Sequence, residues 1–102
     1  MKNGWTATAL LLFAATVNAQ GQDALNLRSL AATCAACHGT EGRVVGGGGV
    51  PGLAGQPREA LATQLRAFKA GTRPSTIMTQ LSKGYSDAQI DQLAGYFSML
   101  KP

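Results

Sequence analysis

Two cysteines and one histidine stand together in Cys34-Ala35-Ala36-Cys37-His38, and the chain of 102 residues has no other cysteine or histidine. Thiols three residues apart on a helical turn can each add to a vinyl group of a haem, and the next residue then lies under the iron. This spacing is typical of covalent c-type haem attachment. We therefore expect one haem c, bound through Cys34 and Cys37, with His38 as an axial iron ligand. The second ring nitrogen of His38 should donate a hydrogen bond to a backbone carbonyl.

Two other kinds of cysteine site compete with haem attachment. A redox dithiol of the thioredoxin type would need a strand before the motif and a helix after it. Here a helical pattern precedes the cysteines and a glycine-rich segment follows them. A structural zinc ion takes four ligands, usually Cys and His, and the chain offers only three such residues. Both alternatives are therefore disfavoured.

Methionine is the natural sixth ligand of the iron, because the chain has no second histidine. Met99 falls in the predicted last helix, where a packing role is the default, and Met1 is removed with the signal peptide predicted below. Met78 lies in a predicted loop 40 residues after His38, from which its thioether can reach the opposite haem face. A His/Met pair raises the reduction potential of a haem. The expected pair is His38 and Met78; the alternative for Met78 is to fill a gap in the core.

The motif is expected at the end of a helix over residues 23–36. Apolar residues recur there at i, i+3, i+4 and i+7, which is the spacing of one helix face. They are Leu27, Leu30, Ala31 and Cys34. Gly39 can provide the left-handed turn that ends this helix. Residues 39–56 contain eight glycines and Pro51, so we expect a loop that can approach a flat ligand closely, since few β-carbons intervene.

Two more helices are predicted towards the carboxyl end. Pro57 suits the first turn of one helix, and Gly71 ends it. After a loop over residues 72–85, Ser86 and Gln89 form a capping box that starts the last helix at about Asp87. The apolar face of the middle helix contains Leu61, Leu65 and Phe68, and that of the last helix contains Ile90, Leu93, Ala94, Phe97 and Leu100.

The amino-terminal residues are typical of a secretory signal peptide. Lys2 supplies a positive start, and the apolar stretch 9–15 is an h-region. Val17-Asn18-Ala19 predicts cleavage after Ala19, so that residues 1–19 are a signal peptide and residues 20–102 one haem-binding domain in the periplasm. A membrane anchor is the alternative, but a spanning helix needs about 20 mainly apolar residues. The apolar region around residues 9–15 is interrupted by Thr6, Thr8, Thr16 and Asn18.

Other functional classes find little support. The net charge is +4, but the basic residues are scattered and lack interleaved aromatic residues, which disfavours nucleic-acid binding. The run of glycines at 46–49 lacks the Gly-Lys-Ser/Thr ending of a phosphate-binding loop. The five carboxylates are dispersed, so no catalytic constellation is expected.

With these ligands, the chain resembles the class I cytochromes c over nearly all of residues 20–102. The resemblance implies an all-α fold of three to four helices around one covalently attached haem, with crossing amino- and carboxyl-terminal helices. The segment 51–56 matches the family's Pro-containing segment. It implies that the Pro51 carbonyl accepts the hydrogen bond from His38 and that Leu53 packs on the haem. Tyr96-Phe97 similarly resembles the family's aromatic contact with the first helix.

A more specific resemblance is to the haem subunit of flavocytochrome c sulfide dehydrogenase. It is carried by Pro51-Gly52-Leu53-Ala54-Gly55-Gln56-Pro57, by Phe68-Lys69-Ala70-Gly71-Thr72-Arg73, and by Thr76-Ile77-Met78 with Lys83-Gly84-Tyr85-Ser86-Asp87. Some members of that subunit family carry two haems, whereas this chain can hold one. The partner implied is an FAD-containing sulfide dehydrogenase subunit, which would pass electrons through this haem to another acceptor such as a cytochrome.

The leading expectation is therefore electron transfer by a monohaem subunit that has no catalytic site of its own and no permanent membrane anchor. The alternative is a free soluble cytochrome c that shuttles electrons to a terminal oxidase or reductase. A haem sensor is a third possibility, which Met78 disfavours because a sixth protein ligand closes the iron to small molecules.

Overall fold

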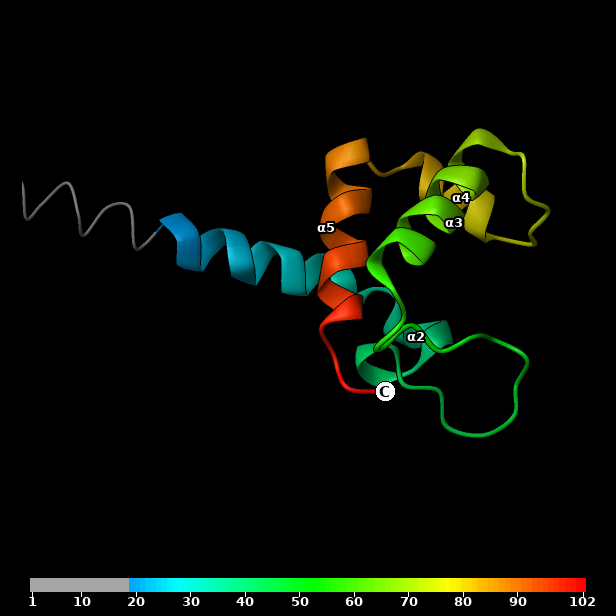
Figure 1. Cartoon of the computed structure of the whole chain (residues 1–102), viewed down its shortest axis with the longest axis horizontal. Helices are drawn as coiled ribbons and strands as arrows, with labels where there is room; N and C mark the ends of the chain where they lie inside the picture. Colours follow the sequence, from blue (N-terminus) through cyan, green and yellow to red (C-terminus); the bar gives the residue numbers. More distant parts are fainter. Residues whose placement is uncertain (1–18) are drawn as a thin grey trace, which may run out of the picture.

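The computed structural model describes residues 19–102, and this part of the chain is built from helices and loops without a strand (Figure 1). The predicted signal peptide lies outside the described residues, apart from Ala19. None of the described helices has the length and apolar character needed to cross a membrane.

The helix that leads into the haem motif covers residues 19–32, and the motif itself follows on a separate short helix, α2 (Ala35–His38). The prediction of one continuous helix over residues 23–36 was wrong, because the chain turns at Thr33 and Cys34. The Thr33 hydroxyl donates to the Leu30 carbonyl oxygen at 2.7 Å, and the Cys34 amide bonds to Ala31 three residues back. A threonine hydroxyl that takes a helix carbonyl in this way competes with the helical pattern.

Gly39 ends α2 and leads into a 3-10 turn, η1 (Thr40–Gly42). Its φ of +82° is positive, as expected, but its ψ of 161° is extended and differs from that of a left-handed helical turn. A β-carbon at this position would lie 1.9 Å from the Arg43 carbonyl oxygen. Only glycine therefore fits the turn that follows the motif.

The middle helix, α3 (Arg58–Ala70), begins directly after Pro57. Gly71 ends it in the left-handed conformation, with φ +75° and ψ 11°. Its amide bonds to the Phe68 carbonyl oxygen at 3.1 Å, as a glycine at the end of a helix commonly does. This prediction is confirmed.

A short helix that the sequence did not predict, α4 (Met78–Lys83), follows α3. Met78 was expected in a loop, and that expectation was wrong: it is the first residue of this helix. The Ser75 hydroxyl accepts a hydrogen bond from the Thr79 amide at 2.9 Å and lies 2.8 Å from the Thr79 hydroxyl. Ser75 thereby satisfies an amide that the first turn of a helix leaves unpaired.

The last helix, α5 (Asp87–Ser98), begins where the capping box predicted. The Gln89 amide donates to the Ser86 hydroxyl at 3.1 Å, and the Ser86 amide donates to the Gln89 side chain at 2.9 Å. Both bonds of the capping box are therefore present, which confirms the predicted start.

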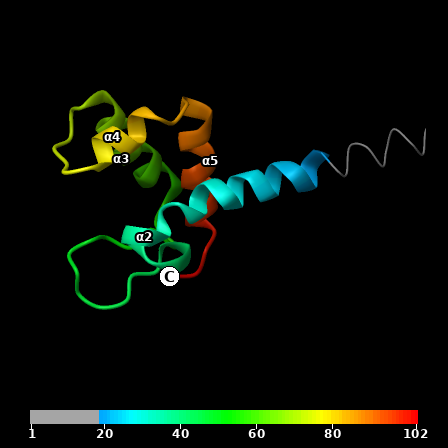
Figure 2. The same ribbon diagram turned by 180° about the vertical axis from the view of Figure 1, so that it is seen from behind.

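The core joins the first helix to α3 and α5. The helix at 19–32 crosses α5, and α3 lies beside α5 (Figures 1 and 2). Tyr96 and Phe97 belong to the apolar cluster at this junction, with their rings edge to face at 5.2 Å between centroids. The buried members of the cluster are Ala31, Leu61, Ala62, Ile90, Leu93, Ala94 and Phe97. So small a core is typical of domains that rely on a cofactor for part of their stability.

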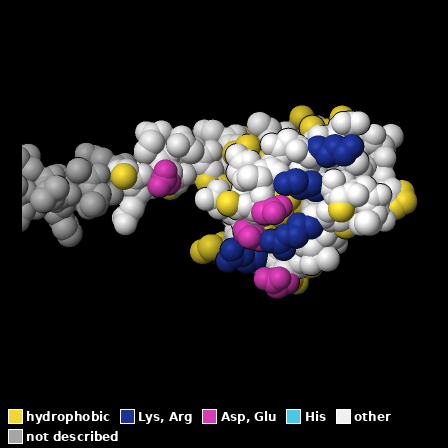
Figure 3. Space-filling model, turned by 90° about the horizontal axis from the view of Figure 1, so that it is seen from above, with side chains coloured by type: hydrophobic (Ala, Val, Ile, Leu, Met, Phe, Trp, Pro, Cys, Tyr) yellow, Lys and Arg dark blue, Asp and Glu magenta, His cyan; other side chains and the backbone are white. Residues whose placement is uncertain are grey.

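On the face shown in Figure 3, lysine and arginine side chains lie next to aspartate and glutamate side chains. Two ion pairs, Arg66 with Asp91 and Lys69 with Asp87, connect α3 to α5. Both pairs are partly exposed, so each contributes at most about 1 kcal/mol to the free energy of unfolding.

Candidate haem site

A cavity of about 560 Å³ opens beside α2, α3, α4 and α5. Its volume falls within the roughly 300–1,000 Å³ of small-molecule and cofactor sites. Its walls are mainly apolar, with Leu61, Leu65 and Phe68 from α3 and Leu93, Ala94 and Phe97 from α5. Part of the core surface therefore remains uncovered by protein and is suited to a flat apolar ligand.

Cys34, Cys37 and His38 all line this cavity. The two cysteines are not joined in a disulfide, and Cys37 is exposed while Cys34 is half-buried. Burial raises the pKa of the Cys34 thiol, and a hydrogen bond with the Thr33 side chain lowers it by less. A raised pKa is the opposite of the activated thiolate that redox dithiols use. Both thiols line the cavity, and Cys34 lacks the lowered pKa that a redox dithiol uses.

The His38 ring is held by the Pro51 carbonyl oxygen, which lies 2.7 Å from Nδ1. A carbonyl oxygen can only accept a hydrogen bond, so Nδ1 carries the proton and Nε2 keeps its lone pair for a metal. This is the contact that the resemblance to class I cytochromes c implied. It leaves the ring oriented and in the tautomer needed for iron ligation.

The segment that carries Pro51 is itself fixed by a nearby glycine. The amides of Leu53 and Ala54 both donate to the Gly42 carbonyl oxygen, at 2.8 and 3.2 Å. Leu53 lines the cavity, where the resemblance implied a haem contact. A β-carbon on Gly42 would lie 2.9 Å from that of Leu53, so this close approach requires glycine.

Met78 lines the same cavity from α4. In both ribbon views α4 lies away from α2, which carries His38 (Figures 1 and 2). The two expected iron ligands are thus brought to one cavity from separate elements. The thioether is a soft donor, and the imidazole presents its Nε2; this donor set suits haem iron.

The sequence did not single out several polar residues at this cavity, which are Gln64, Arg73, Ser75, Thr76 and Tyr85. Arg73, Ser75 and Thr76 belong to the loop before α4. Arg73, Thr76 and Tyr85 stand in the segments that carry the resemblance, but no role was assigned to them from the sequence. The place of the loop residues on the wall depends on how that loop folds.

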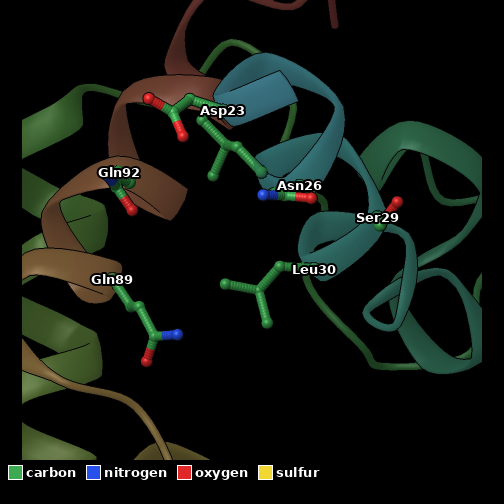
Figure 4. Close-up of a pocket in the computed structure, with 7 residues that line it drawn as sticks. Asp23, Asn26, Ser29, Leu30, Gln89 and Gln92 are labelled. Atoms are coloured by element: carbon green, nitrogen blue, oxygen red, sulfur yellow. The ribbon is translucent and has the colours of Figure 1, made fainter. Parts of the chain in front are cut away.

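A second hollow of about 590 Å³ lies between the helix at 19–32 and α5. Asp23, Asn26 and Leu30 face it from the first helix, and Gln89 and Gln92 from α5 (Figure 4). It holds none of the cysteine, histidine or methionine side chains that could bind iron. The candidate haem site is therefore the other cavity.

An all-α fold with a Cys-x-x-Cys-His segment on the wall of an apolar cavity defines a c-type haem protein. The sequence profile of the cytochrome c family matches residues 28–101, so the chain belongs to that family. Membership implies one covalently bound haem c, since the chain has a single attachment motif, and electron transfer as its role.

The chain is similar to several curated cytochromes and electron acceptors. It is 47% identical over 72 residues to the thiosulfate dehydrogenase electron acceptor of Thiomonas intermedia, covering 71% of this chain and 33% of that protein. It is 39% identical over 71 residues to the cytochrome subunit of sulfide dehydrogenase of Chlorobaculum tepidum, covering 70% and 63%. Cytochrome c-554(548) of Halomonas halodenitrificans is 36% identical over 69 residues, covering 65% and 82%. The chain therefore spans a third of the first relative and less than two thirds of the second.

Proposed function

We propose that this chain is a periplasmic electron carrier that accepts single electrons from an FAD-containing sulfide dehydrogenase subunit. The observation that carries the proposal is one cavity lined by Cys34, Cys37 and His38 from one side and by Met78 from another. When bound there, a haem supplies an iron that cycles between the ferric and ferrous states. The sulfide donor is supported by the flanking segments around residues 51–57 and 68–87 and by the relative named a cytochrome subunit of sulfide dehydrogenase.

Each of the cavity residues would have a separate role in binding the haem. Cys34 and Cys37 would anchor it by thioether bonds, and His38 would bind the iron through Nε2 while Pro51 orients the ring. Met78 would complete the iron coordination, and Leu53 would cover the haem surface. A thioether ligand favours the ferrous state and raises the reduction potential, which suits a carrier that must accept electrons.

Export is part of the same proposal. Cleavage after Ala19 would deliver residues 20–102 to the periplasm, where covalent haem attachment would take place at Cys34 and Cys37. The short apolar stretch 9–15 supports a removable signal rather than a permanent anchor.

A second candidate is a freely diffusing carrier whose donor oxidises thiosulfate. The relative from Thiomonas intermedia, named as an electron acceptor of thiosulfate dehydrogenase, favours it. The two candidates share the haem site and differ in the donor and in how long the partners stay together.

The test mixes the purified ferric cytochrome with an FAD-containing sulfide dehydrogenase subunit and sulfide, or with thiosulfate dehydrogenase and thiosulfate. Haem reduction is followed by absorption, and complex formation by size-exclusion chromatography. Sulfide-dependent reduction within a stable complex supports the subunit proposal. Reduction without co-elution favours the diffusing carrier. No reduction by the flavoprotein would contradict the sulfide donor, and carbon monoxide binding by the native ferrous form would instead indicate a ligand-binding module.

A further inference from the structure

A single fully charged side chain lines the haem cavity. Among the described residues that form its walls, Arg73 is the only lysine, arginine, aspartate or glutamate. The surrounding walls are mainly apolar, and the exposed guanidinium of Arg73 can take an anionic group of a bound ligand as its partner. No acidic side chain of the cavity can supply that partner.

Haem itself supplies such a partner. It carries two propionate groups on the edge of the porphyrin opposite the two vinyl groups. Cys34 and Cys37 would bond to the vinyl edge, so the propionates would lie on the side of the cavity away from α2. The loop at 71–77, which carries Arg73, lies away from α2 in both ribbon views (Figures 1 and 2). The loop that carries Arg73 therefore lies, like α4, on the side of the cavity where the propionates are expected.

The Arg73 side chain is held in place before any carboxylate arrives. Its guanidinium carbon lies 4.8 Å from the centroid of the Phe68 ring, a distance at which a cation is attracted to an aromatic face. Its backbone amide bonds to the Ala67 carbonyl oxygen at 3.3 Å, next to that of Thr72 at 3.0 Å. Both contacts tie the residue to the end of α3. A guanidinium fixed in this way loses little freedom on binding a carboxylate with two parallel hydrogen bonds.

We propose that Arg73 binds a haem propionate and thereby sets the reduction potential of this cytochrome. A positive charge close to the haem disfavours the ferric state more than the ferrous state, because the ferric state carries one more positive charge. Arg73 thus raises the potential and keeps the propionate ionised. The inference rests on haem attachment and not on the identity of the electron donor.

Few other groups at the cavity could imitate this effect. The remaining titratable side chains on its walls are Cys34, Cys37, His38 and Tyr85. The two thiols are consumed by thioether bonds, and His38 is committed to the iron and to Pro51. Lys69 does not line the cavity. Its ammonium group donates to the Tyr85 carbonyl oxygen at 2.6 Å and pairs with Asp87. Lys69 therefore already has its partners.

The experiment measures the reduction potential of the holocytochrome between pH 4 and 9 by spectroelectrochemistry. The variants are Arg73→Gln, Arg73→Lys and, as a control with the same loss of charge outside the cavity, Arg28→Gln. Arg73→Gln should lower the potential at neutral pH. The potential should then rise again at acidic pH, where the propionate becomes protonated. This rise should begin about one pH unit higher than in the unmodified protein, the lower end of the effect of a nearby opposite charge, since Arg73 is exposed.

Arg73→Lys should restore most of the potential because it keeps the charge, and Arg28→Gln should leave both the potential and its pH profile nearly unchanged. Equal shifts in Arg73→Gln and Arg28→Gln would overturn the proposal, since the effect would then be one of net charge. An unchanged pH profile in Arg73→Gln would also overturn it. If Arg73→Gln does not mature, the test uses Arg73→Lys. A pH profile of the reduction potential equal to that of the unmodified protein supports the proposal. A rise in potential that begins a full pH unit higher than in the unmodified protein contradicts charge pairing.

Discussion

The imidazole of His38 has one N–H to donate, and the structure commits it to the Pro51 carbonyl oxygen. The other ring nitrogen is left to bind iron. At the scale of the residue, this hydrogen bond and the two cysteines on the same cavity wall define the haem site. Met78 is the residue whose proposed role most needs a direct measurement.

Replacement of Met78 by leucine removes the sulfur while retaining a side chain of similar volume. We expect the weak near-infrared sulfur-to-iron band of the ferric protein to disappear and the reduction potential to fall. Met99→Leu is the matched control, because Met99 is 87% exposed and lies outside the cavity. An unchanged band in Met78→Leu would exclude Met78 as the ligand.

Substitution of Gly39 and Gly46 by alanine compares the effect of a steric clash on the free energy of unfolding with that of a positive φ alone. Both have a φ of +82°, but a β-carbon at Gly39 would lie 1.9 Å from the Arg43 carbonyl oxygen, whereas Gly46 has nothing within 4 Å. Gly46→Ala should lower the free energy of unfolding by about 1–2 kcal/mol, the cost of left-handed backbone in an alanine. Gly39→Ala should cost more or prevent maturation. Urea unfolding of the holoproteins measures both, and equal costs would contradict the clash.

At the scale of the element, α4 places Met78 at the cavity and also buries a hydroxyl group that has no hydrogen-bond partner among the described residues. Ser75 secures its first turn and so positions Met78 at the cavity. Four residues further on, the Ser82 side chain is fully buried, and its hydroxyl has no hydrogen-bond partner among the described residues. A buried hydroxyl without a partner loses its hydration without compensation.

Ser82→Ala should therefore stabilise the protein, by about 1–3 kcal/mol from the removed desolvation penalty. The matched control is Ser98→Ala, in which a hydroxyl that donates to the Gly95 carbonyl oxygen at 2.8 Å is lost. Ser98→Ala should not stabilise. Thermal and urea unfolding provide the measurement. A loss of stability in Ser82→Ala would mean that the hydroxyl has a partner in the mature protein.

The start of α5 depends on a capping box whose two hydrogen bonds both form. Ser86→Ala removes the side-chain acceptor of the Gln89 amide. We expect the free energy of unfolding to fall by about 1 kcal/mol, the usual cost of losing such a cap. Ser29→Ala, at an exposed position within the helix at 19–32, should leave the stability nearly unchanged. A similar loss in both variants would argue against a specific effect of the cap.

At the scale of the whole molecule, a small buried cluster is joined to a large apolar cavity, so the bound haem completes the core. One attachment motif also limits the chain to one electron at a time. The proposed donor, a flavin reduced by sulfide, would hold two electrons. With that donor, a single cytochrome would be reoxidised between two transfers, or two copies would be used.

We expect the exported protein to carry one haem and to take up one electron per chain in a reductive titration. Its intact mass should equal that of residues 20–102 plus one haem, because cleavage is predicted after Ala19. Mass spectrometry under reducing conditions and titration with dithionite measure these quantities. A mass that retains residues 1–19 would refute the cleavage site, and two electrons per chain would refute the single haem.

The sequence alone determined the cofactor, the all-α class and the starts and ends of several helices. These features depend on local chemistry: five consecutive residues form the attachment motif, and Gly71 and Ser86 act within one turn of the helices that they bound. The most specific expectation from the sequence, the pairing of His38 with Met78, came from counting the ligands available. It could be made without knowing where the haem lies.

Only the tertiary structure decided how the motif is presented. The break at Thr33 and the helical start at Met78 involve local hydrogen bonds of Thr33 and Ser75 that the apolar pattern did not indicate, and the approach of Pro51 to His38 joins two separate segments. Arg73 stands in one of the segments that carry the resemblance, but its place on the cavity wall and beside the Phe68 ring is seen only in the fold. Cavity walls are assembled from distant parts of the chain, so their composition follows from packing rather than from spacing along the sequence.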